Sequence, residues 1–483
     1  MRPVLLVVMD GVGLRDSSER NAFKQAETPN LDALMEDGFA ELQASGPAVG
    51  LPEGYQGNSE VGHLHLGAGR RVPQRLTRIN NAIENDELRE NTALTQALER
   101  AEGNGNAVHF AGIVSDGGIH GHIDHLEALL EIASGYDVDE VYVHAFTDGR
   151  DVPPKSAERY LSKVEEWCSE YGAEIATVIG RFYSMDRDKN WGRTHKAYRA
   201  MAEAEGFEFE SITEPLEATY EQGDYDYFVI PSVKKSYPGM ADEDEIIFYN
   251  YRADRERQIE ELLVGTKELD EELPVHPNFT SMFRYEKDIE NPAIFEKKIV
   301  EDTLGEKIED AGLSQLRVAE SQKIPHVTYF FNGQRELEFE HETREFIESD
   351  KIKAYDQAPE MHADETTKIV LGAVENREHD FVLLNYANGD LVGHTGDLEA
   401  AVTAMETVDR NIGKLVDAVE NSDYVMLVTA DHGNCEDMGQ EDDPNTSHTL
   451  NPVPLIGVNT EKDFEDGEIW SVENIVGDIL GLS

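Results

Sequence analysis

Six carboxylate and imidazole side chains, each just after an apolar run or in a polar loop, could together bind metal ions. Asp390 and His394 are spaced D-x-x-x-H, so they lie on neighbouring positions of a helical turn or face each other across a tight loop. Mixed carboxylate and imidazole ligands suit Mn²⁺, Zn²⁺ or a similar divalent ion, and six ligands are too many for one four-coordinate site. We therefore predict a two-metal site of the kind that serves phosphoryl transfer. Its candidate ligands are Asp10, Asp390, His394, Asp431, His432 and, with the weakest spacing, His448.

The glycine-rich stretch GNSEVGHLHLG, residues 57–67, contains one serine, Ser59. It matches neither the G-x-S-x-G elbow of hydrolases nor a phosphate-binding P-loop. A lone serine of this kind usually caps a helix or closes a turn. Beside two divalent ions, however, its hydroxyl would become an activated nucleophile because coordination lowers its pKa, and the glycines would let the backbone approach the ions. We therefore expect Ser59 to be the nucleophile.

A second group of candidate residues lies in the middle of the chain and is rich in arginine. Guanidinium groups bind carboxylate and phosphate in bidentate fashion, so a small substrate with both groups would fit. Asp151 could act as a general base for a substrate hydroxyl, and His120 could hydrogen-bond a phosphate. Each arginine could equally form a salt bridge with the abundant acids. The arginines are Arg150, Arg181, Arg187, Arg252 and Arg255.

Seven apolar runs must position these side chains, since each run ends in one of the polar groups. Near-continuous apolar runs predict strands buried on both faces, as in parallel sheets, and open α/β sheets place their chemistry outside the carboxyl ends of the strands. The runs are VLLVVMDG, VHFAGIVSDGGIHGH, EVYVHAFTDGRD, IATVIGRFYSMDRD, EIIFYNYRADR, HDFVLLNYANGDLVGH and YVMLVTADHG.

The order of these runs along the chain predicts two α/β domains, each a mainly parallel sheet flanked by helices. Asp and His endings occur at the start of the chain and again after about residue 380, whereas arginine endings occur between them. The first domain would combine residues 1–74 and 299–483, and the second, 75–298, would be inserted. The chain would cross between them near Arg75 and in the polar stretch 286–298.

The chain is long enough for two domains and unusually acidic. It has 483 residues, 39% of them hydrophobic, and its net charge of -56 comes from 98 acids spread along the chain against 42 bases. High salt would screen this self-repulsion, because the Debye length falls to about 3 Å near 1 M. We expect a halophilic cytoplasm, with an unusually acidic mesophile protein as the alternative. No basic stripe offers a surface for nucleic acid.

Localisation and redox chemistry follow from what the sequence lacks. It has no charged-then-apolar N-terminal signal and no apolar run of about 18 residues, so we expect a cytoplasmic protein without a membrane partner. The two cysteines, Cys168 and Cys435, are too few for a cysteine zinc site and too far apart in sequence to suggest a disulfide framework. Cys435 lies near His432, and we expect it to be a bystander.

Longer segments around these residues carry a resemblance to a known family. They are VVMDGVG, TPNLDAL, GNSEVGHLHLGAGR, VSDGGIHGHIDHL, HAFTDGRDVPPKSA, IGRFYSMDRDKNWGR, NYRADR, AESQKIPHVTYFFNG, NGDLVGHTGD, TADHGNCEDM and SHTLNPVP. In this order, and over essentially the whole chain, the sequence resembles the cofactor-independent phosphoglycerate mutases of the alkaline phosphatase superfamily. The resemblance implies an alkaline-phosphatase-like core with an inserted transferase domain.

The resemblance also implies the reaction and the roles of the site residues. A monomeric isomerase of glycolysis and gluconeogenesis would interconvert 3-phosphoglycerate and 2-phosphoglycerate, independently of 2,3-bisphosphoglycerate, through a phosphoserine at Ser59. One Mn²⁺ would be held by Asp390, His394 and His448, and the other by Asp10, Ser59, Asp431 and His432. Lys323, in AESQKIPH, would help Ser59 to lose its proton and would stabilise the phosphoryl group. The substrate pocket would comprise His120, Arg150, Asp151, Arg181, Arg187, Arg252, Arg255 and Lys323.

The chain departs from the family pattern in two places, and three rival functions share part of it. Tyr55 and Gln56 stand in GYQGNSEVGH, where the family usually has GQMGNSEVGH, and Gly389 replaces a proline, which would loosen the loop before Asp390.

A metal-dependent phosphatase or sulfatase would need no arginine group. Phosphopentomutase carries a different inserted domain. A non-catalytic metal-binding protein would need neither nucleophile nor lysine.

Overall fold

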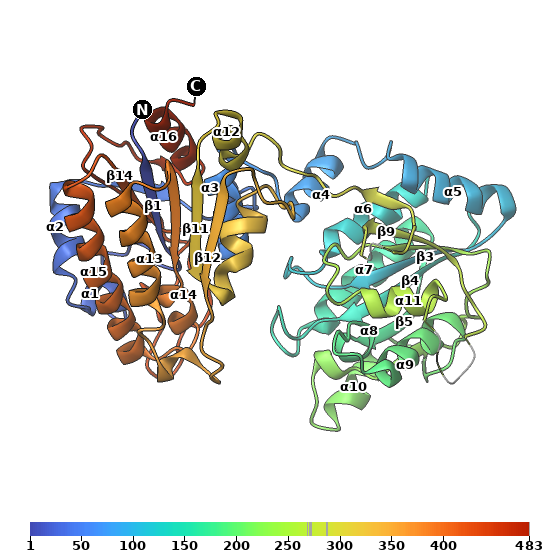
Figure 1. The fold of residues 1–483 in the computed structure, drawn as a ribbon. Helices are drawn as coiled ribbons and strands as arrows, with labels where there is room; N and C mark the ends of the chain where they lie inside the picture. Colours follow the sequence, from blue (N-terminus) through green and yellow to red (C-terminus); the bar gives the residue numbers. More distant parts are fainter. Residues whose placement is uncertain (268, 270–272, 286–287, 483) are drawn as a thin grey trace. The chain divides into compact units, whose positions relative to one another are not determined.

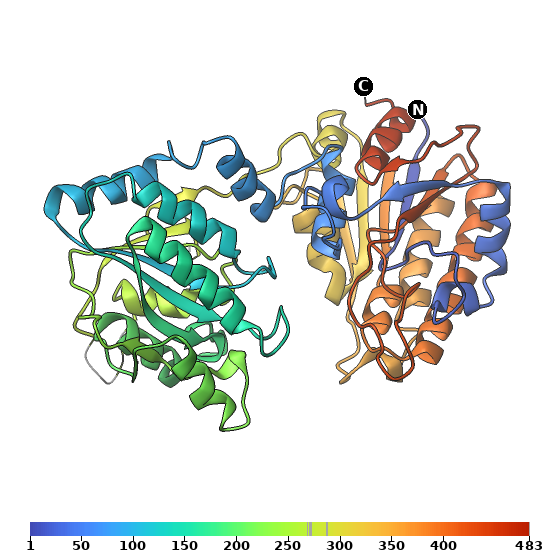
Figure 2. The same ribbon diagram turned by 180° about the vertical axis from the view of Figure 1, so that it is seen from behind.

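The computed structural model describes residues 1–267, 269, 273–285 and 288–482, and the chain divides into two compact units (Figures 1 and 2). Unit 1 comprises Met1–Gln74 and Ile299–Ser483, and unit 2 comprises Arg75–Lys298. In the polar stretch 286–298, where a crossing between domains was expected, Glu286 and Lys287 lie outside the described residues.

Unit 1 is built on an eight-stranded sheet with the order β12-β11-β13-β1-β14-β15-β2-β16. The five strands from β12 to β14 run parallel, whereas β15 pairs antiparallel with both β14 and β2. Strands β1, β13 and β14 are buried along their whole length, as expected of strands covered on both faces. The strands are β1 (Val4–Met9), β2 (Ala40–Gln43), β11 (Gln315–Glu320), β12 (Glu342–Ile347), β13 (Phe381–Tyr386), β14 (Val425–Thr429), β15 (Val453–Val458) and β16 (Gly467–Glu468).

Helices cover both faces of the unit 1 sheet. Helices α13 and α15 pack together against one face, as Figure 1 shows, and α16 packs against β1 and α3 on the other, seen in Figure 2. The helices are α1 (Ala22–Gln25), α2 (Pro29–Asp37), α3 (Ser59–Ala68), α12 (Leu304–Asp310), α13 (Ala363–Asn376), α14 (Asn388–Gly393), α15 (Leu398–Glu420) and α16 (Ser471–Leu480). Shorter helical turns are η1 (Gly46–Val49), η3 (Ser321–Lys323), η4 (His326–Phe330) and η5 (Tyr355–Gln357).

Unit 2 is built on a second eight-stranded sheet, with the order β10-β9-β8-β3-β4-β5-β7-β6. Neighbouring strands are parallel except for the pair β5 and β7. The strands are β3 (Val108–Ile113), β4 (Val141–Thr147), β5 (Glu174–Gly180), β6 (Phe207–Phe209), β7 (Ser232–Lys234), β8 (Glu245–Phe248), β9 (Asn278–Phe283) and β10 (Ala293–Phe295).

Helices also cover this second sheet, and the unit has its own hydrophobic core. Helices α6 and α7 pack together on one face, and α9 and α11 pack together on the other. The helices are α4 (Arg75–Glu84), α5 (Thr92–Asn104), α6 (Ile123–Ala133), α7 (Ala157–Tyr171), α8 (Arg181–Ser184), α9 (Trp191–Ala202), α10 (Thr213–Tyr220), α11 (Arg257–Leu263) and the turn η2 (Asp226–Phe228).

The predicted fold class is confirmed, since each unit is a mainly parallel sheet flanked by helices. The seven apolar runs form β1, β3, β4, β5, β8, β13 and β14. No helix in the described ranges is both long and apolar enough to cross a membrane. Cys168 and Cys435 are buried free thiols.

Candidate active site

The carboxyl ends of four neighbouring strands of unit 1 carry most of the residues expected at the metal site. Asp10 directly follows β1, and Lys323 closes the turn η3 after β11. Asp390 lies in α14 after β13, and Asp431 follows β14 with one residue between. Because β11, β13, β1 and β14 are adjacent and parallel, these side chains meet at one edge of the sheet.

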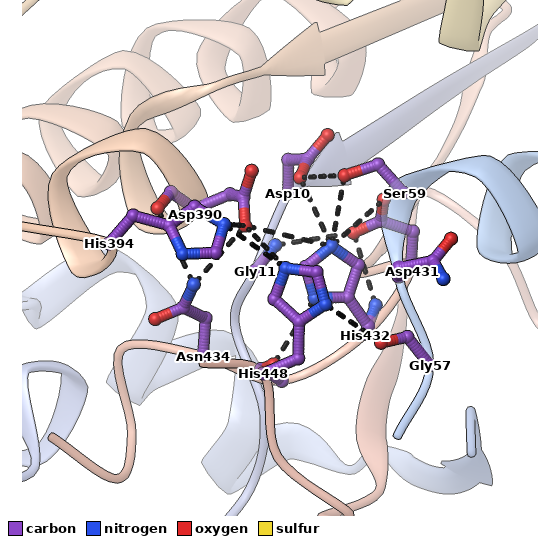
Figure 3. Close-up of polar contacts among 12 residues, drawn as sticks. Asp10, Gly11, Gly57, Ser59, Asp390, His394, Asp431, His432, Asn434 and His448 are labelled. Carbon is purple, nitrogen blue, oxygen red and sulfur yellow. Dashed lines mark hydrogen bonds and ion pairs between the residues drawn. The ribbon is translucent and has the colours of Figure 1, made fainter. Parts of the chain in front are cut away.

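Ser59 is the first residue of α3 and lies at the centre of this group. Its Oγ is 3.1 Å from Asp10 Oδ1, 3.0 Å from His432 Nε2 and 2.8 Å from Lys323 Nζ (the first two contacts are drawn in Figure 3). The helix-capping role belongs instead to Asn58, whose Oδ1 accepts a hydrogen bond from the backbone N–H of Val61. The hydroxyl of Ser59 is therefore not used as a cap, and it lies at a helix N-terminus, which favours negative charge.

Glycines let the backbone segments of the site lie in direct contact. A Cβ on Gly62 would lie 2.5 Å from Asp431 O, so α3 can pack against the loop after β14 only without a side chain there. A Cβ on Gly389 would lie 2.7 Å from Asp10 O. Gly389 belongs to the helix α14, so the loop that this residue was expected to loosen before Asp390 is helical instead.

Asp390, His394 and His448 form the first candidate ligand group. Nε2 of His394 and Nε2 of His448 lie 3.1 and 3.3 Å from Asp390 Oδ1, and 3.1 Å from each other. Each Nδ1 faces a carbonyl oxygen, at 2.7 Å for His394 and 2.9 Å for His448, and therefore carries the proton of the neutral ring. The Nε2 lone pairs of the neutral rings and a carboxylate oxygen then lie close together, and Figure 3 shows the three side chains side by side. Three converging acceptors fit a cation.

Asp10, Asp431, His432 and Ser59 form the second candidate ligand group. His432 Nε2 lies 3.5 Å from Asp10 Oδ1 and 3.7 Å from Asp431 Oδ2. All four side chains are buried, yet Asp431 Oδ2 has no hydrogen-bond partner among the described residues. Since buried carboxylate oxygens are nearly always satisfied, this oxygen and its acceptor neighbours also fit a divalent cation.

Lys323 contributes a positive charge to the site. Its Nζ donates hydrogen bonds to Asp10 Oδ1 and to Asp390 Oδ2, both at 2.7 Å. Burial alone would raise the pKa of these two carboxyl groups, but the ammonium group lowers both below their ordinary value. Conversely, burial would lower the pKa of Lys323, and the carboxylates of Asp10, Asp390 and Asp431 raise it. Three carboxylates against one ammonium group leave negative charge for cations to neutralise.

Two buried residues that the sequence analysis missed, His63 and Asn385, also contact this group. His63 Nδ1 lies 3.0 Å from Asp431 Oδ2, and Asn385 Nδ2 donates a hydrogen bond to Asp10 Oδ2 at 2.7 Å. Helical spacing could have identified His63, because it lies four residues after Ser59 and hence on the same helix face. Asn385 interrupts an apolar run one residue before its end.

In unit 2, the carboxyl ends of the adjacent strands β8, β3, β4 and β5 carry the residues expected in the substrate pocket. Arg181 is buried at the end of β5, and its Nη1 lies 2.6 Å from both Asp148 Oδ1 and Asp151 Oδ2. Arg150 has an exposed side chain, and its backbone N–H donates to Asp148 Oδ1. Asp148, which the sequence analysis did not single out, thus fixes the turn that carries Asp151.

The other three arginines expected in the pocket, Arg187, Arg252 and Arg255, lie near His120 or its neighbour Asp254. Arg187 and Arg252 both pair with Asp254, at 3.1 and 3.5 Å, while Arg255 is buried and donates to a backbone carbonyl. His120 Nδ1 is buried without a hydrogen-bond partner among the described residues. Burial and then the charge of Arg181 lower the pKa of His120 to about 3, so its ring is neutral. This arginine cluster suits an anion.

Comparisons with known proteins identify the family of the chain. A family model described as "Metalloenzyme superfamily" matches residues 2–481. A 2,3-bisphosphoglycerate-independent phosphoglycerate mutase from Moorella thermoacetica is 45% identical over 100% of this chain and 96% of its own length. The crystal structure of Leishmania mexicana phosphoglycerate mutase at low cobalt concentration is 31% identical, with a TM-score of 0.72 over 99% of this chain and 95% of that one.

Proposed function

Because the chain belongs to the Metalloenzyme superfamily and, within it, to the 2,3-bisphosphoglycerate-independent phosphoglycerate mutases, we propose that it isomerises phosphoglycerate through a phosphoserine at Ser59. The observation that carries this proposal is the setting of the Ser59 hydroxyl. It is buried at a helix N-terminus, within 3.1 Å of a carboxylate, an imidazole and an ammonium group. No other described serine has this set of partners.

Two divalent ions would be held in unit 1 by the two ligand groups described above. Bound there, they would lower the pKa of the serine hydroxyl and neutralise phosphoryl oxygens. We propose Mn²⁺, since carboxylate and imidazole ligands together suit it. The Leishmania relative was crystallised with cobalt, which is also a divalent transition-metal ion.

The protein's own groups would handle the proton of the nucleophile. Asp10 Oδ1 is an acceptor within reach of the Ser59 hydroxyl, at 3.1 Å, whereas His432 Nε2, at 3.0 Å, is proposed as a metal ligand and has no lone pair left for the proton. Lys323 has no lone pair when charged, so it stabilises the alkoxide and the phosphoryl group rather than accepting the proton. In the first half-reaction the phosphorus–oxygen bond of the substrate breaks and a phosphorus–Oγ bond forms. The departing substrate oxygen takes up one proton, which balances the proton released by Ser59, and glycerate is left.

In the second half-reaction the other hydroxyl of glycerate would take the phosphoryl group back. Asp151 would accept the proton of that hydroxyl, the bond from phosphorus to Oγ would break, and Ser59 would regain a proton. Arg181 Nη1 contacts Asp151 Oδ2 and so fixes the orientation of this carboxylate. The substrate carboxylate and phosphate would be bound by Arg150, Arg181, Arg187, Arg252 and Arg255, with His120 and Lys323.

The two units would therefore have different roles. Unit 1 would be the phosphatase-like, metal-binding domain, and unit 2 the inserted domain that binds substrate and allows transfer rather than hydrolysis. This assignment is supported by the separate clusters: the acids and histidines lie in unit 1 and the arginines in unit 2.

The proposal extends to the state of the protein in the cell. We infer a monomer in the cytoplasm, where phosphoglycerate is found, at high salt and without nucleic acid or membrane as a partner. The support is the net charge of -56, which disfavours polyanions and calls for screening.

A mutase assay tests the function against the rival phosphatase. We would supply 3-phosphoglycerate and Mn²⁺ in molar KCl, omit 2,3-bisphosphoglycerate, and measure 2-phosphoglycerate and free phosphate. We expect 2-phosphoglycerate, with conversion abolished by EDTA. Free phosphate without 2-phosphoglycerate would identify a phosphatase, and activity only on pentose phosphates would identify a phosphopentomutase.

A further inference from the structure

His63 and Asn385 link the two carboxylates of the second ligand group beneath the nucleophile. Asn385 lies on β13, between the strand of Asp10 and that of Lys323, and His63 lies one helical turn after Ser59 on α3. The side chains of both residues are buried, with at most 1% of either residue exposed. Nothing in the proposed chemistry uses either of them.

The hydrogen bonds of Asn385 fix which of its atoms is the amide nitrogen. The atom 2.7 Å from Asp10 Oδ2 must be a donor, because a carboxylate oxygen accepts. The same Nδ2 lies 3.1 Å from His63 Nε2. Its two hydrogens can therefore serve Asp10 and His63 together, which an aspartate at this position could not do.

The hydrogen bonds of His63 likewise fix its tautomer. Nδ1 lies 3.0 Å from the backbone carbonyl oxygen of Ser59, which only accepts, so Nδ1 carries the proton. Nε2 then accepts from Asn385. Both ring nitrogens are engaged, so His63 has no lone pair left for a metal ion. This holds although ligand atoms of His63, Asp10 and Asp431 lie within 4.8 Å of one another.

The ring of His63 also packs against Asp431. Its Nδ1 edge lies 3.0 Å from Asp431 Oδ2, yet this oxygen receives no hydrogen bond from the described residues. Backbone N–H groups of Gly11 and His432 donate to Oδ1, at 3.2 and 3.1 Å, and the His63 ring limits the space on the Oδ2 side, where the lone pairs stay available. The link runs from Asp10 through Asn385 and His63 to Asp431, and it includes the backbone of Ser59.

We propose that His63 and Asn385 are positioning residues that hold Asp10, Asp431 and Ser59 at the spacing required by the second metal ion, without binding that ion. This inference rests on the proposed assignment of Asp10 and Asp431 as ligands. Residues that orient metal ligands typically change metal affinity by about 10–100-fold when they are replaced. His63→Phe and Asn385→Leu should each lower the affinity for the second metal ion by a factor of this order.

The chain offers a matched control in His65, a second buried histidine on the same helix. Its Nδ1 faces the carbonyl oxygen of Val61, four residues earlier, and its Nε2 accepts from the backbone N–H of Val72. His65 therefore has the same burial and the same hydrogen-bonding pattern as His63, but no hydrogen bond or ion pair with the proposed ligands among those described. His65→Phe should leave metal affinity unchanged.

Calorimetric titration of Mn²⁺ into the EDTA-stripped full-length protein, in molar KCl, tests the inference without an activity readout. We expect two Mn²⁺ per chain in the wild type, in His63→Phe and in Asn385→Leu. In both variants the dissociation constant of one ion, the one assigned to the second ligand group, should rise about 10–100-fold. His63→Asn, which keeps a donor near Ser59 O, should recover part of the affinity. If His63→Phe does not fold, the titration of Asn385→Leu alone tests the inference.

Three results would overturn the inference. Unchanged affinity in both variants would make the pair merely structural, and a loss of one Mn²⁺ per chain in His63→Phe would make His63 a ligand. An equal loss in His65→Phe would point to a general effect on α3. If the wild type itself binds fewer than two Mn²⁺, the proposed metal assignment fails, which is a separate outcome.

Discussion

At Ser59, the proposed nucleophile, one ammonium group contacts a hydroxyl and two carboxylates that are all buried. Lys323 Nζ lies 2.7–2.8 Å from Ser59 Oγ, Asp10 Oδ1 and Asp390 Oδ2. A preorganised charge of this kind stabilises the negative charge that develops during phosphoryl transfer. It also means that the carboxylates would repel each other more strongly if the ammonium group were removed.

Replacing Lys323 by methionine should therefore impair the chemical step. We expect Lys323→Met to lower kcat by about 10²–10³-fold, as does loss of one preorganised donor to a developing oxyanion. Steady-state kinetics at saturating Mn²⁺ would measure this. Lys414→Met, which removes an exposed lysine paired with Asp364, should leave kcat within a factor of two or so. A kcat equal to wild type in Lys323→Met would exclude this role for the lysine.

At the scale of single residues, the sequence allowed the chemistry-bearing side chains to be predicted but not their surroundings. Asp390 and His394 could be paired from their spacing, which α14 now explains. Lys323 was available only from the family resemblance, because it follows β11, whose polar sequence hides the strand. Asn385 could not be found, since an asparagine in an apolar run does not indicate its partner.

Among the elements, α3 contains a position where close packing, rather than helix propensity, determines which residue type can be accommodated. Gly62 lies inside this helix, where alanine would ordinarily be favoured by about 0.5–1 kcal/mol. A Cβ there, however, would lie 2.5 Å from Asp431 O and 2.7 Å from Asp431 Cβ. The close approach of α3 to the loop after β14 therefore depends on this glycine.

Gly62→Ala should accordingly destabilise the protein, by about 1–3 kcal/mol, because overpacking displaces the backbone. It should also weaken Mn²⁺ binding, since the displaced loop carries Asp431. Gly372→Ala, at a position in α13 with no atom within 4 Å of the new Cβ, should instead stabilise by about 0.5–1 kcal/mol. Urea unfolding of the two variants would measure both effects, and stabilisation by Gly62→Ala would contradict the packing described here.

At the level of elements, the seven apolar runs were sufficient to predict the central parallel strands. The strand β11 was not recognised, because Gln315 and Arg317 interrupt its apolar pattern. Arg317 is nevertheless fully buried, and its guanidinium group lies 4.5 Å from the ring centroid of Phe331. Tertiary stacking of this kind overrides a pattern-based prediction. Strand β7, which pairs antiparallel with β5 and lies next to the edge strand β6, is too short to give a pattern.

For the whole molecule, the dominant property is the charge of -56. Because the acids are spread along the chain, both units carry self-repulsion that only counterions can reduce. The Debye length rises from about 3 Å at 1 M salt to about 30 Å at 0.01 M, so repulsion then acts across a whole unit.

We therefore expect activity and the thermal unfolding midpoint to fall as KCl is removed by dialysis. Potassium glutamate at the same ionic strength should restore both, because screening does not depend on the anion. Mutase activity and circular dichroism at each salt concentration would measure the effect. Full activity after long dialysis into dilute buffer would rule out the halophilic interpretation.

The most direct test of the central claim is detection of the phosphoryl group on Ser59. We would mix the Mn²⁺-loaded enzyme with 3-phosphoglycerate, quench within a turnover, and analyse the peptide containing residues 57–67 by mass spectrometry. The account predicts that this peptide gains the mass of one phosphoryl group, assigned to Ser59, and that Ser59→Ala shows neither the label nor conversion. Conversion at the wild-type rate by Ser59→Ala, or a label on another residue, would contradict it.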